Sequence, residues 1–420
     1  MSKLKRFLSI LGPGFVTGAA DDDPSGIGTY SQTGAQFGYS QLWLALFSFP
    51  FMLIVQEMCG RIGLVNGKGL SRLIKKHYPA PVLYGLILIL LIANIINIGA
   101  DLGAMAESAS LLLGFPHWVW LGLITTGSLF LQVFVPYKQY SNILKYLTLS
   151  LLAYIITAFI LKLNWQEVGW ATLMPHVSFQ KDYLMNIVAI LGTTISPYLF
   201  FWQASEEVEC LVEDEKIKDM SVGRPDPKKI NLSEMRLDTL VGMFFSQLVM
   251  FFIIVTAAAT LHAHHITHID TAAKAAQALK PIVGEFAYLL FASGIIGTGL
   301  LAVPVLAGSG AYAVAEARGW PLGLYKKPQE AKPFYGVIVL SVLLGFGVNF
   351  MGIPPFQMLY YTAVLNGLCA PPLMVLILLL ANNRKIMGQQ VNKPISNWIG
   401  WIITGIMSIS GVALLSQLGK

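Results

Sequence analysis

Charged residues are scarce in this chain: only 12% of its 420 residues are Asp, Glu, Lys or Arg, whereas 55% are hydrophobic. A soluble domain carries about twice that share of charge, which argues against a water-soluble enzyme. Cysteine is also rare, and Cys59, Cys210 and Cys369 lie too far apart to suggest a disulfide framework or a thiolate metal site. No hydrophilic segment is longer than the one from Glu213 to Glu234. These shortages predict a polytopic membrane protein with no separate soluble domain.

Eleven apolar runs are long enough to cross a bilayer, which takes about 20 residues. They fall at roughly 8–37, 41–65, 82–113, 117–137, 141–162, 184–212, 235–261, 282–317, 333–352, 354–382 and 396–418. We therefore expect one transmembrane domain over residues 1–420, built from helices.

Lysine and arginine gather in alternate connections between these runs. The N-terminus and the connections after the second, fourth, sixth, eighth and tenth runs are basic, and the others are poor in both residues apart from Lys181, Lys274 and Lys280. The positive-inside rule then predicts a multi-pass protein of the plasma or inner membrane, with its N-terminus in the cytoplasm and its C-terminus outside. Because the basic residues lie in short loops, the net charge of +6 is no sign of nucleic-acid binding. The oligomeric state is left open, with a monomer as the working expectation.

Three consecutive aspartates, Asp21-Asp22-Asp23, stand inside the first apolar run. A carboxylate at membrane depth costs about 2.5–3.5 kcal/mol on insertion scales, so three of them argue for a function. Pro24 follows directly and removes a backbone donor, and Gly26 tolerates strained dihedral angles. We expect the helix to break here and to leave bare carbonyl groups beside the carboxylates. This combination predicts a cation site in the membrane.

The sixth run repeats this pattern over residues 192–197, where a glycine and three hydroxyl residues precede a proline. Taken alone, the segment also fits an ordinary proline kink whose freed carbonyls are satisfied by hydroxyl groups. The two breaks, however, fall in matching members of two five-run halves, at about 8–162 and 184–382, with 396–418 as an extra helix. An odd number of runs inverts the second half, and paired broken helices in such repeats indicate a transporter site at the midplane.

The residues around the first break resemble a known family. Asp23-Pro24-Ser25-Gly26, followed by Gly34-Ala35-Gln36-Phe37-Gly38-Tyr39, is similar to the first-helix signature of the Nramp divalent-metal transporters, in which Asp-Pro-Gly-Asn precedes Gly-Ala-Gln-Phe-Gly-Tyr. The spacing matches without a gap, and the resemblance covers nearly the whole chain. It implies an all-α polytopic membrane protein with the LeuT-type fold: two inverted five-helix repeats plus an eleventh helix, with helices one and six broken.

Helices one and six depart from the family pattern at the expected site. Gly26 replaces the family's asparagine in helix one. In helix six, where Nramp proteins carry Ala-x-x-Met-Pro-His, alignment on Pro197 places Ser196 at the methionine and Tyr198 at the histidine. Met174-Pro175-His176 spells the family tripeptide, but it lies in the polar loop before the sixth run and cannot reach a midplane site.

Helices three and ten also differ from the family. The family's Asp-Leu-Ala-Glu becomes Asp101-Leu102-Gly103-Ala104, so the glutamate of the family's proton route is missing. The family's metal-linked glutamine falls on Ala363, with Asn366 one turn later. Asp101 is an intramembrane acid and hence functional by default. Glu107 lies in the same run, and the alternative is that Asp101 and Glu107 are a buried pair satisfied by hydroxyl groups or by Asn94 and Asn97.

These departures change the expected cargo. A thioether is a soft ligand that favours transition metals, whereas Mg²⁺ takes oxygen ligands and keeps several waters. Ser196, Thr193 and Thr194 leave an oxygen-lined site, and the small residue Gly26 widens it for a partly hydrated ion. The pattern resembles the Nramp-related magnesium transporters, which implies uncoupled, alternating-access uptake of Mg²⁺, with Mn²⁺ also carried. The ion is cargo, so no cofactor is expected.

The metal site is assigned to the two breaks, with Asp23 as the main ligand. The full set is Asp23, Asp22, Gly26, Thr193 and Ser196, and the secondary candidates are Asp21, Thr194, Asp101, Glu206, Glu207 and Asn366. Glu206 and Glu207 follow the second break toward the cytoplasm. They are expected either to line an inner vestibule that attracts cations or to form a solvated helix end.

Three other functions stay open as alternatives. A proton-coupled Mn²⁺/Fe²⁺ transporter would share the fold, but position 196 argues against it. An amino-acid transporter of this fold needs free amides for a carboxylate, which three aspartates would repel. A membrane metalloenzyme would use the cluster His262, His264, His265 and His268, whose spacing suits Zn²⁺. The same cluster fits a polar external loop.

Overall fold

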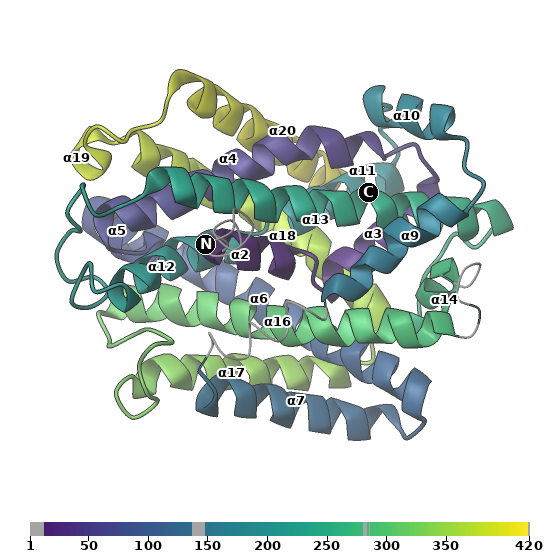
Figure 1. Ribbon diagram of the computed structural model, residues 1–420, viewed down its shortest axis with the longest axis horizontal. Helices are drawn as coiled ribbons and strands as arrows, with labels where there is room; N and C mark the ends of the chain where they lie inside the picture. The colour runs from purple at the N-terminus through teal and green to yellow at the C-terminus, as the bar shows by residue number, and fades with distance from the viewer. Residues whose placement is uncertain (1–11, 137–147, 280–283, 285, 419–420) are drawn as a thin grey trace, which may run out of the picture.

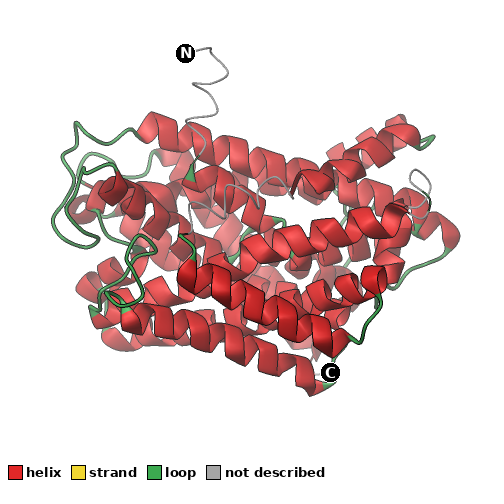
Figure 2. Cartoon of the chain, turned by 60° about the horizontal axis from the view of Figure 1, so that its bottom comes forward, coloured by secondary structure: helices red, strands yellow, loops and turns green. Residues whose placement is uncertain are grey.

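The computed structural model describes residues 12–136, 148–279, 284 and 286–418. Within these ranges every regular element is helical and no strand occurs, as Figure 2 shows. The α-helices are α2 (Pro13–Asp21), α3 (Pro24–Phe37), α4 (Trp43–Asn66), α5 (Leu70–His77), α6 (Ala80–Leu113), α7 (His117–Phe134), α9 (Leu152–Ile160), α10 (Trp165–Leu173), α11 (Lys181–Thr194), α12 (Pro197–Glu213), α13 (Leu232–Thr260), α14 (Ala272–Ala276), α16 (Phe286–Arg318), α17 (Lys332–Val348), α18 (Pro355–Asn382), α19 (Arg384–Met387) and α20 (Pro394–Leu418). Short 3₁₀ turns cover Thr148–Leu151, His262–His264, Gln277–Leu279 and Asn349–Met351.

Nine of the eleven predicted runs are long apolar helices in the described part of the chain. The first run is absent from this count because it is divided into α2 and α3, each too short to span a bilayer alone. The fifth run lies partly outside the described residues, and its described α-helical part is α9. The break predicted in the sixth run is present between α11 and α12. The all-α fold with broken helices one and six is therefore confirmed.

The long helices lie side by side in Figure 1, from α20 and α4 at the top, through α13 and α2, to α16, α17 and α7 at the bottom. On one side α6 packs against α16, α17, α18 and α7, and on the other α13 packs against α2, α3 and α4. The four half-helices lie between these groups, and nearly all their described side chains are buried. The polar residues of both breaks are thus held at the centre of the molecule.

Short helices cover the two ends of this bundle (Figure 1). α5 and α19 lie at the end where the basic connections gather, and α10 and α14 lie at the opposite end. α10 occupies the segment that the sequence analysis treats as a polar loop, and Met174 caps its C-terminus. The family-like tripeptide at 174–176 therefore lies at the surface, as expected.

Glycines allow the half-helices to pack closely. A Cβ atom on Gly192 of α11 would lie 2.0 Å from the carbonyl oxygen of Ala363 and 2.4 Å from the backbone nitrogen of Gly367, both on α18. Real Cβ atoms do not approach backbone atoms this closely, so the two helices must separate if any side chain is added. Ala363, which aligns with the family's glutamine, thus lies at a helix crossing.

We predict that Gly192→Ala lowers the melting temperature of the detergent-purified protein, because overpacking costs about 1–3 kcal/mol. Thermal unfolding followed by intrinsic fluorescence measures the effect. Gly122→Ala in α7 is the matched control, since a Cβ there meets no atom within 4 Å. Equal melting temperatures for the two variants would contradict the close crossing.

Candidate metal site

The first break forms where Asp23 ends one half-helix and begins the next. Asp22 follows the last residue of α2, and Asp23 is the N-cap of α3, with Pro24 at the first helical position, where its missing N–H costs nothing. Asp23 Oδ1 accepts hydrogen bonds from the Gly26 backbone N–H at 2.7 Å and from the Ser25 hydroxyl at 2.6 Å. The carboxylate therefore satisfies the donors that the break exposes.

The second oxygen of Asp23 faces α6. Asn97 Nδ2 donates to Asp23 Oδ2 at 3.0 Å. Asp101 lies one turn further along α6, is 0% exposed, and has no hydrogen-bond partner on either oxygen among the described residues. The alternative that Asn94 and Asn97 satisfy Asp101 is wrong, because Asn94 donates instead to α16 and Asn97 donates to Asp23.

Asp21 and Asp22 share one donor from α13. The Ser246 hydroxyl lies 2.6 Å from Asp21 Oδ2 and 3.3 Å from Asp22 Oδ1. Since a hydroxyl carries a single proton, it serves one carboxylate at a time. Asp21 Oδ1 and Asp22 Oδ2 are buried without a hydrogen-bond partner among the described residues. Buried anionic oxygens of this kind require a cation, a proton or water.

The hydroxyl groups at the second break point back along α11. Ser196 Oγ lies within hydrogen-bond distance of the carbonyl oxygens of Gly192, at 2.7 Å, and Thr193, at 2.6 Å, and its one proton serves one of them at a time. Thr193 and Thr194 both donate to the carbonyl oxygen of Ile190, at 2.9 and 3.0 Å. The protons thus behave as in a proline kink, while the oxygen lone pairs of these three residues stay available to a cation.

A hydrogen bond joins the two breaks, and a glycine keeps space free within the first. The Tyr198 hydroxyl, at the position of the family's histidine, donates to the carbonyl oxygen of Ala20 at 3.1 Å. A Cβ on Gly26 would lie 3.1 Å from the carbonyl oxygen of Asp21 and 3.6 Å from Asp23 Oδ1. A side chain at position 26 would therefore crowd the space beside the carboxylates, and glycine leaves that space free.

Two secondary candidates, Glu206 and Glu207 of α12, line a cavity whose lining does not include the aspartates of the first break. This cavity, of about 770 Å³, lies at the end of the bundle where α12 ends and α13 begins, and Glu209 and Asp238 line it as well. Glutamates and aspartates outnumber lysines in this lining. Asn366 is buried in α18 with its Oδ1 unpartnered among the described residues. This acidic cavity is thus separate from the site at the breaks.

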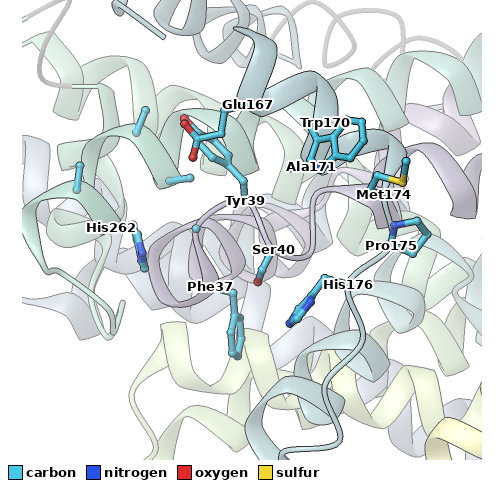
Figure 3. Close-up of a pocket in the computed structure, with 14 residues that line it drawn as sticks. Phe37, Tyr39, Ser40, Glu167, Trp170, Ala171, Met174, Pro175, His176 and His262 are labelled. Atoms are coloured by element: carbon cyan, nitrogen blue, oxygen red, sulfur yellow. The ribbon is translucent and has the colours of Figure 1, made fainter. Parts of the chain in front are cut away.

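A second cavity, of about 640 Å³, lies at the C-terminal end of α3, and Figure 3 shows its lining. Phe37, Tyr39, Trp170 and His262 face it together with Glu167. Neither cavity includes Asp21, Asp22 or Asp23 in its lining, and these three side chains are at most 2% exposed. The aspartates are therefore enclosed by protein.

The histidine cluster does not converge. His262 Nδ1 lies 2.9 Å from the carbonyl oxygen of Ala35, and His264 Nδ1 lies 2.6 Å from that of Thr260. Among the described residues, no group of three or more His, Cys, Asp or Glu side chains is arranged to hold a metal ion. The alternative of a zinc enzyme therefore has no metal site to support it among the described residues. The three aspartates likewise form no such group in the part of the chain that the structure describes.

Comparison with known proteins identifies the family. Residues 14–417 match the model of the Nramp family, described as natural resistance-associated macrophage protein-like. The chain belongs to the Nramp family. It is 25% identical to the divalent metal cation transporter MntH of Deinococcus radiodurans, over 99% of this chain and 92% of that protein. It is 24% identical to the MntH of Klebsiella pneumoniae, over 98% and 95%.

Solved structures share the Nramp fold. A manganese transporter of Eremococcus coleocola, in complex with an aromatic bis-isothiourea substituted compound, superposes with a TM-score of 0.75 at 16% identity, over 99% of this chain and 88% of that one. Mhp1, a nucleobase-cation-symport-1 family transporter, superposes with a TM-score of 0.59 at 13% identity, over 97% and 90%. The LeuT-type arrangement expected for an Nramp protein is thus present, and this chain is a multi-pass membrane protein and not an enzyme.

Two residues of this site, Asn97 and Ser246, were missed as partners of the aspartates. The sequence suggests Asn97 only as a partner of Asp101, one turn away on the same helix. Ser246 follows Asp238 by eight residues in the seventh run, so both lie on one helical face, and this spacing is the only signal the sequence contains.

We predict that a divalent cation raises the melting temperature of the wild type, because it binds the native carboxylates only. Replacing Asp21 and Asp22 together by asparagine removes this rise and stabilises the cation-free protein, since two buried like charges are lost. Differential scanning fluorimetry with and without Mg²⁺ or Mn²⁺ measures both effects. Asp226→Asn, in an exposed loop, is the control. An undiminished cation effect in the double variant would refute the site.

Proposed function

We propose that this Nramp protein carries divalent cations across the membrane by alternating access, with Mg²⁺ as its main cargo and Mn²⁺ also carried. One observation supports this most directly. The side chains assigned as ligands at the two breaks carry oxygen donors: the carboxylates of Asp21, Asp22 and Asp23 and the hydroxyl of Ser196, which stands at the position of the family's soft ligand. A donor set of carboxylate and hydroxyl oxygens suits a hard cation.

The names of the relatives support the cation class. The MntH proteins are called divalent metal cation transporters, and the Eremococcus protein is called a manganese transporter. Preference for Mg²⁺ rests on the donor chemistry of this chain and not on those names.

The free oxygens suggest how the ion is held. Asp23 keeps unused lone pairs on a carboxylate that is fixed by three donors, which suits a main ligand. Asp21 Oδ1 and Asp22 Oδ2 have no partner among the described residues and so give these two aspartates a larger share in binding than the sequence suggested. Because the carboxylates form no closed cage, retained waters would complete the shell around a Mg²⁺ ion.

Uncoupled transport is supported by the loss of titratable groups. Asp101 is retained in α6, but its family partner is replaced by Ala104, and Tyr198 stands at the histidine position. A continuous proton relay along these helices would lack two members. Proton-coupled Mn²⁺ transport is the second candidate, and the buried, unpartnered Asp101 is the observation that favours it.

The proposed orientation has the α5–α19 end in the cytoplasm. Arg224 Nη2 donates to Asn66 Oδ1 at 3.2 Å and to the carbonyl oxygen of Ile386 at 3.1 Å, which draws basic loops together. Partial burial and the nearby cations, Arg224 among them, lower the pKa of the Lys68 ammonium group. Such a concentration of positive charge fits the positive-inside rule. The acidic cavity at the same end would attract the released ion by electrostatic focusing.

We predict that proteoliposomes containing the wild type take up Mg²⁺ without acidifying their interior, and that Asp23→Ala abolishes this uptake. Removal of the carboxylate takes away a ligand and the cap of α3. A fluorescent Mg²⁺ indicator and a pH indicator, both enclosed, measure the two quantities. Transition-metal uptake without Mg²⁺ uptake, or metal-driven acidification, would overturn the proposal in favour of the second candidate.

We also predict that Ser196→Met raises the uptake of Cd²⁺ and Mn²⁺ relative to Mg²⁺, by about tenfold, because it restores a soft ligand and narrows the site. Competition between Mg²⁺ and Cd²⁺ in the same proteoliposomes measures the ratio. Ser196→Ala serves as the control, since it removes the hydroxyl without adding sulfur. An identical ratio of Cd²⁺ to Mg²⁺ uptake in both variants would show that residue 196 does not determine the cation preference.

A further inference from the structure

One face of α13 follows the whole length of α2. Asp238, Gly242 and Ser246 are spaced by four residues, so they lie above one another on the helix surface. All three are buried, and α2 is a principal neighbour of α13. We call Asp238, Gly242 and Ser246 the α13 stripe.

The first member of the stripe fixes the beginning of α2. Asp238 Oδ1 accepts the backbone N–H groups of Gly12 at 2.9 Å and Phe15 at 3.0 Å, and Oδ2 accepts that of Gly14 at 2.7 Å. These N–H groups have no partner inside their own helix, and a carboxylate also complements the positive end of the helix dipole. A side chain of α13 thus caps α2 from outside the helix.

The middle of the stripe brings the two backbones together. A Cβ on Gly18 would lie 2.3 Å from the carbonyl carbon of Gly242, and a Cβ on Gly242 would lie 2.2 Å from the carbonyl oxygen of Gly14. Gly14 and Gly18 form a small-xxx-small pair, which is a common way for membrane helices to pack closely. No space is left for α2 to slide along α13.

The third member contacts the site itself. Ser246 holds the carboxylates of Asp21 and Asp22, the last residue of α2 and the one after it, with the distances given above. Like charges at this separation repel each other, and a shared donor on a fixed helix reduces that repulsion. The position of this hydroxyl is set by the same face of α13 that fixes the start of α2.

We propose that Ser246 is a positioning residue of the cation site, and that the α13 stripe sets the spacing of Asp21 and Asp22 by fixing α2 at both ends. This inference rests on the proposed function only in that a divalent cation binds at these aspartates. Mg²⁺ demands near-ideal octahedral geometry with short bonds, whereas Ca²⁺ accepts longer bonds and irregular shells. A site whose carboxylates are held at a fixed spacing discriminates between the two ions.

The test compares Ser246→Ala with Ser48→Ala in proteoliposome uptake. Ser48 is the matched control: it is buried in α4 and its hydroxyl donates to Gln247 of α13 at 3.3 Å, without contact to the aspartates. Ser246→Ala is expected to raise the KM for Mg²⁺ by about tenfold, because a hydrogen bond to a charged group is lost. It should leave Vmax nearly unchanged and lower the ratio of Mg²⁺ to Ca²⁺ uptake.

A second variant tests whether the stripe acts as a unit. Asp238→Asn keeps the size of the side chain but removes one acceptor from the start of α2. If both residues act through α2, the combined variant raises KM by less than the product of the two single effects. A product of independent effects would overturn the claim of a common unit.

The experiment distinguishes a wrong positioning role for Ser246 from a wrong proposal that Mg²⁺ is the cargo. If the wild type takes up Mn²⁺ but no Mg²⁺, the cargo proposal fails, and the same KM comparison is made with Mn²⁺. If Ser246→Ala matches Ser48→Ala in both KM and ion ratio for whichever ion the wild type carries, the positioning role is overturned. Melting temperatures of all variants confirm that the proteins compared are folded.

Discussion

The burial of three neighbouring carboxylates without a cationic side chain is the constraint around which this molecule is organised. Among the described residues, no lysine or arginine forms an ion pair with Asp21, Asp22 or Asp23. Their hydrogen-bond donors include the Gly26 backbone N–H, the hydroxyls of Ser25 and Ser246, and the amide of Asn97. Breaking helix one is what exposes the N–H groups beside Asp23, so the interrupted helix and the buried charge depend on each other.

If the protein carries a divalent cation, as proposed, the incomplete compensation of the aspartates' negative charge has a function. A lysine in the same place would neutralise the aspartates permanently and remove the negative charge that attracts a cation. Dipolar donors lower the cost of the empty state without removing the attraction for a cation. The acidic cavity beyond α12 extends this attraction toward one end of the protein, whereas the aromatic cavity of Figure 3 at the other end carries little charge of either sign.

The sequence predicted features that depend on neighbours along the chain. The break at Asp23-Pro24 follows from a capping carboxylate and a proline, whereas the break at Ser196-Pro197 follows from the proline, since the Ser196 side chain makes no capping hydrogen bond. Partners on other helices were not predictable, because a buried hydroxyl or amide fits many positions until the packing is known. Asn97 illustrates this, since it lies one turn from Asp101 but donates to Asp23. α10 was missed because nine residues give too short a pattern.

α13 holds both halves of helix one and not only α2. On the other side of the break, a Cβ on Gly34 of α3 would lie 2.4 Å from the carbonyl oxygen of Ile254, further along α13. With 29 residues, α13 is about 43 Å long and reaches from one membrane surface to the other. Under the proposed alternating access, a tilt of α13 about its middle would carry α2 and α3 in opposite directions, because one half-helix is held near each end of it.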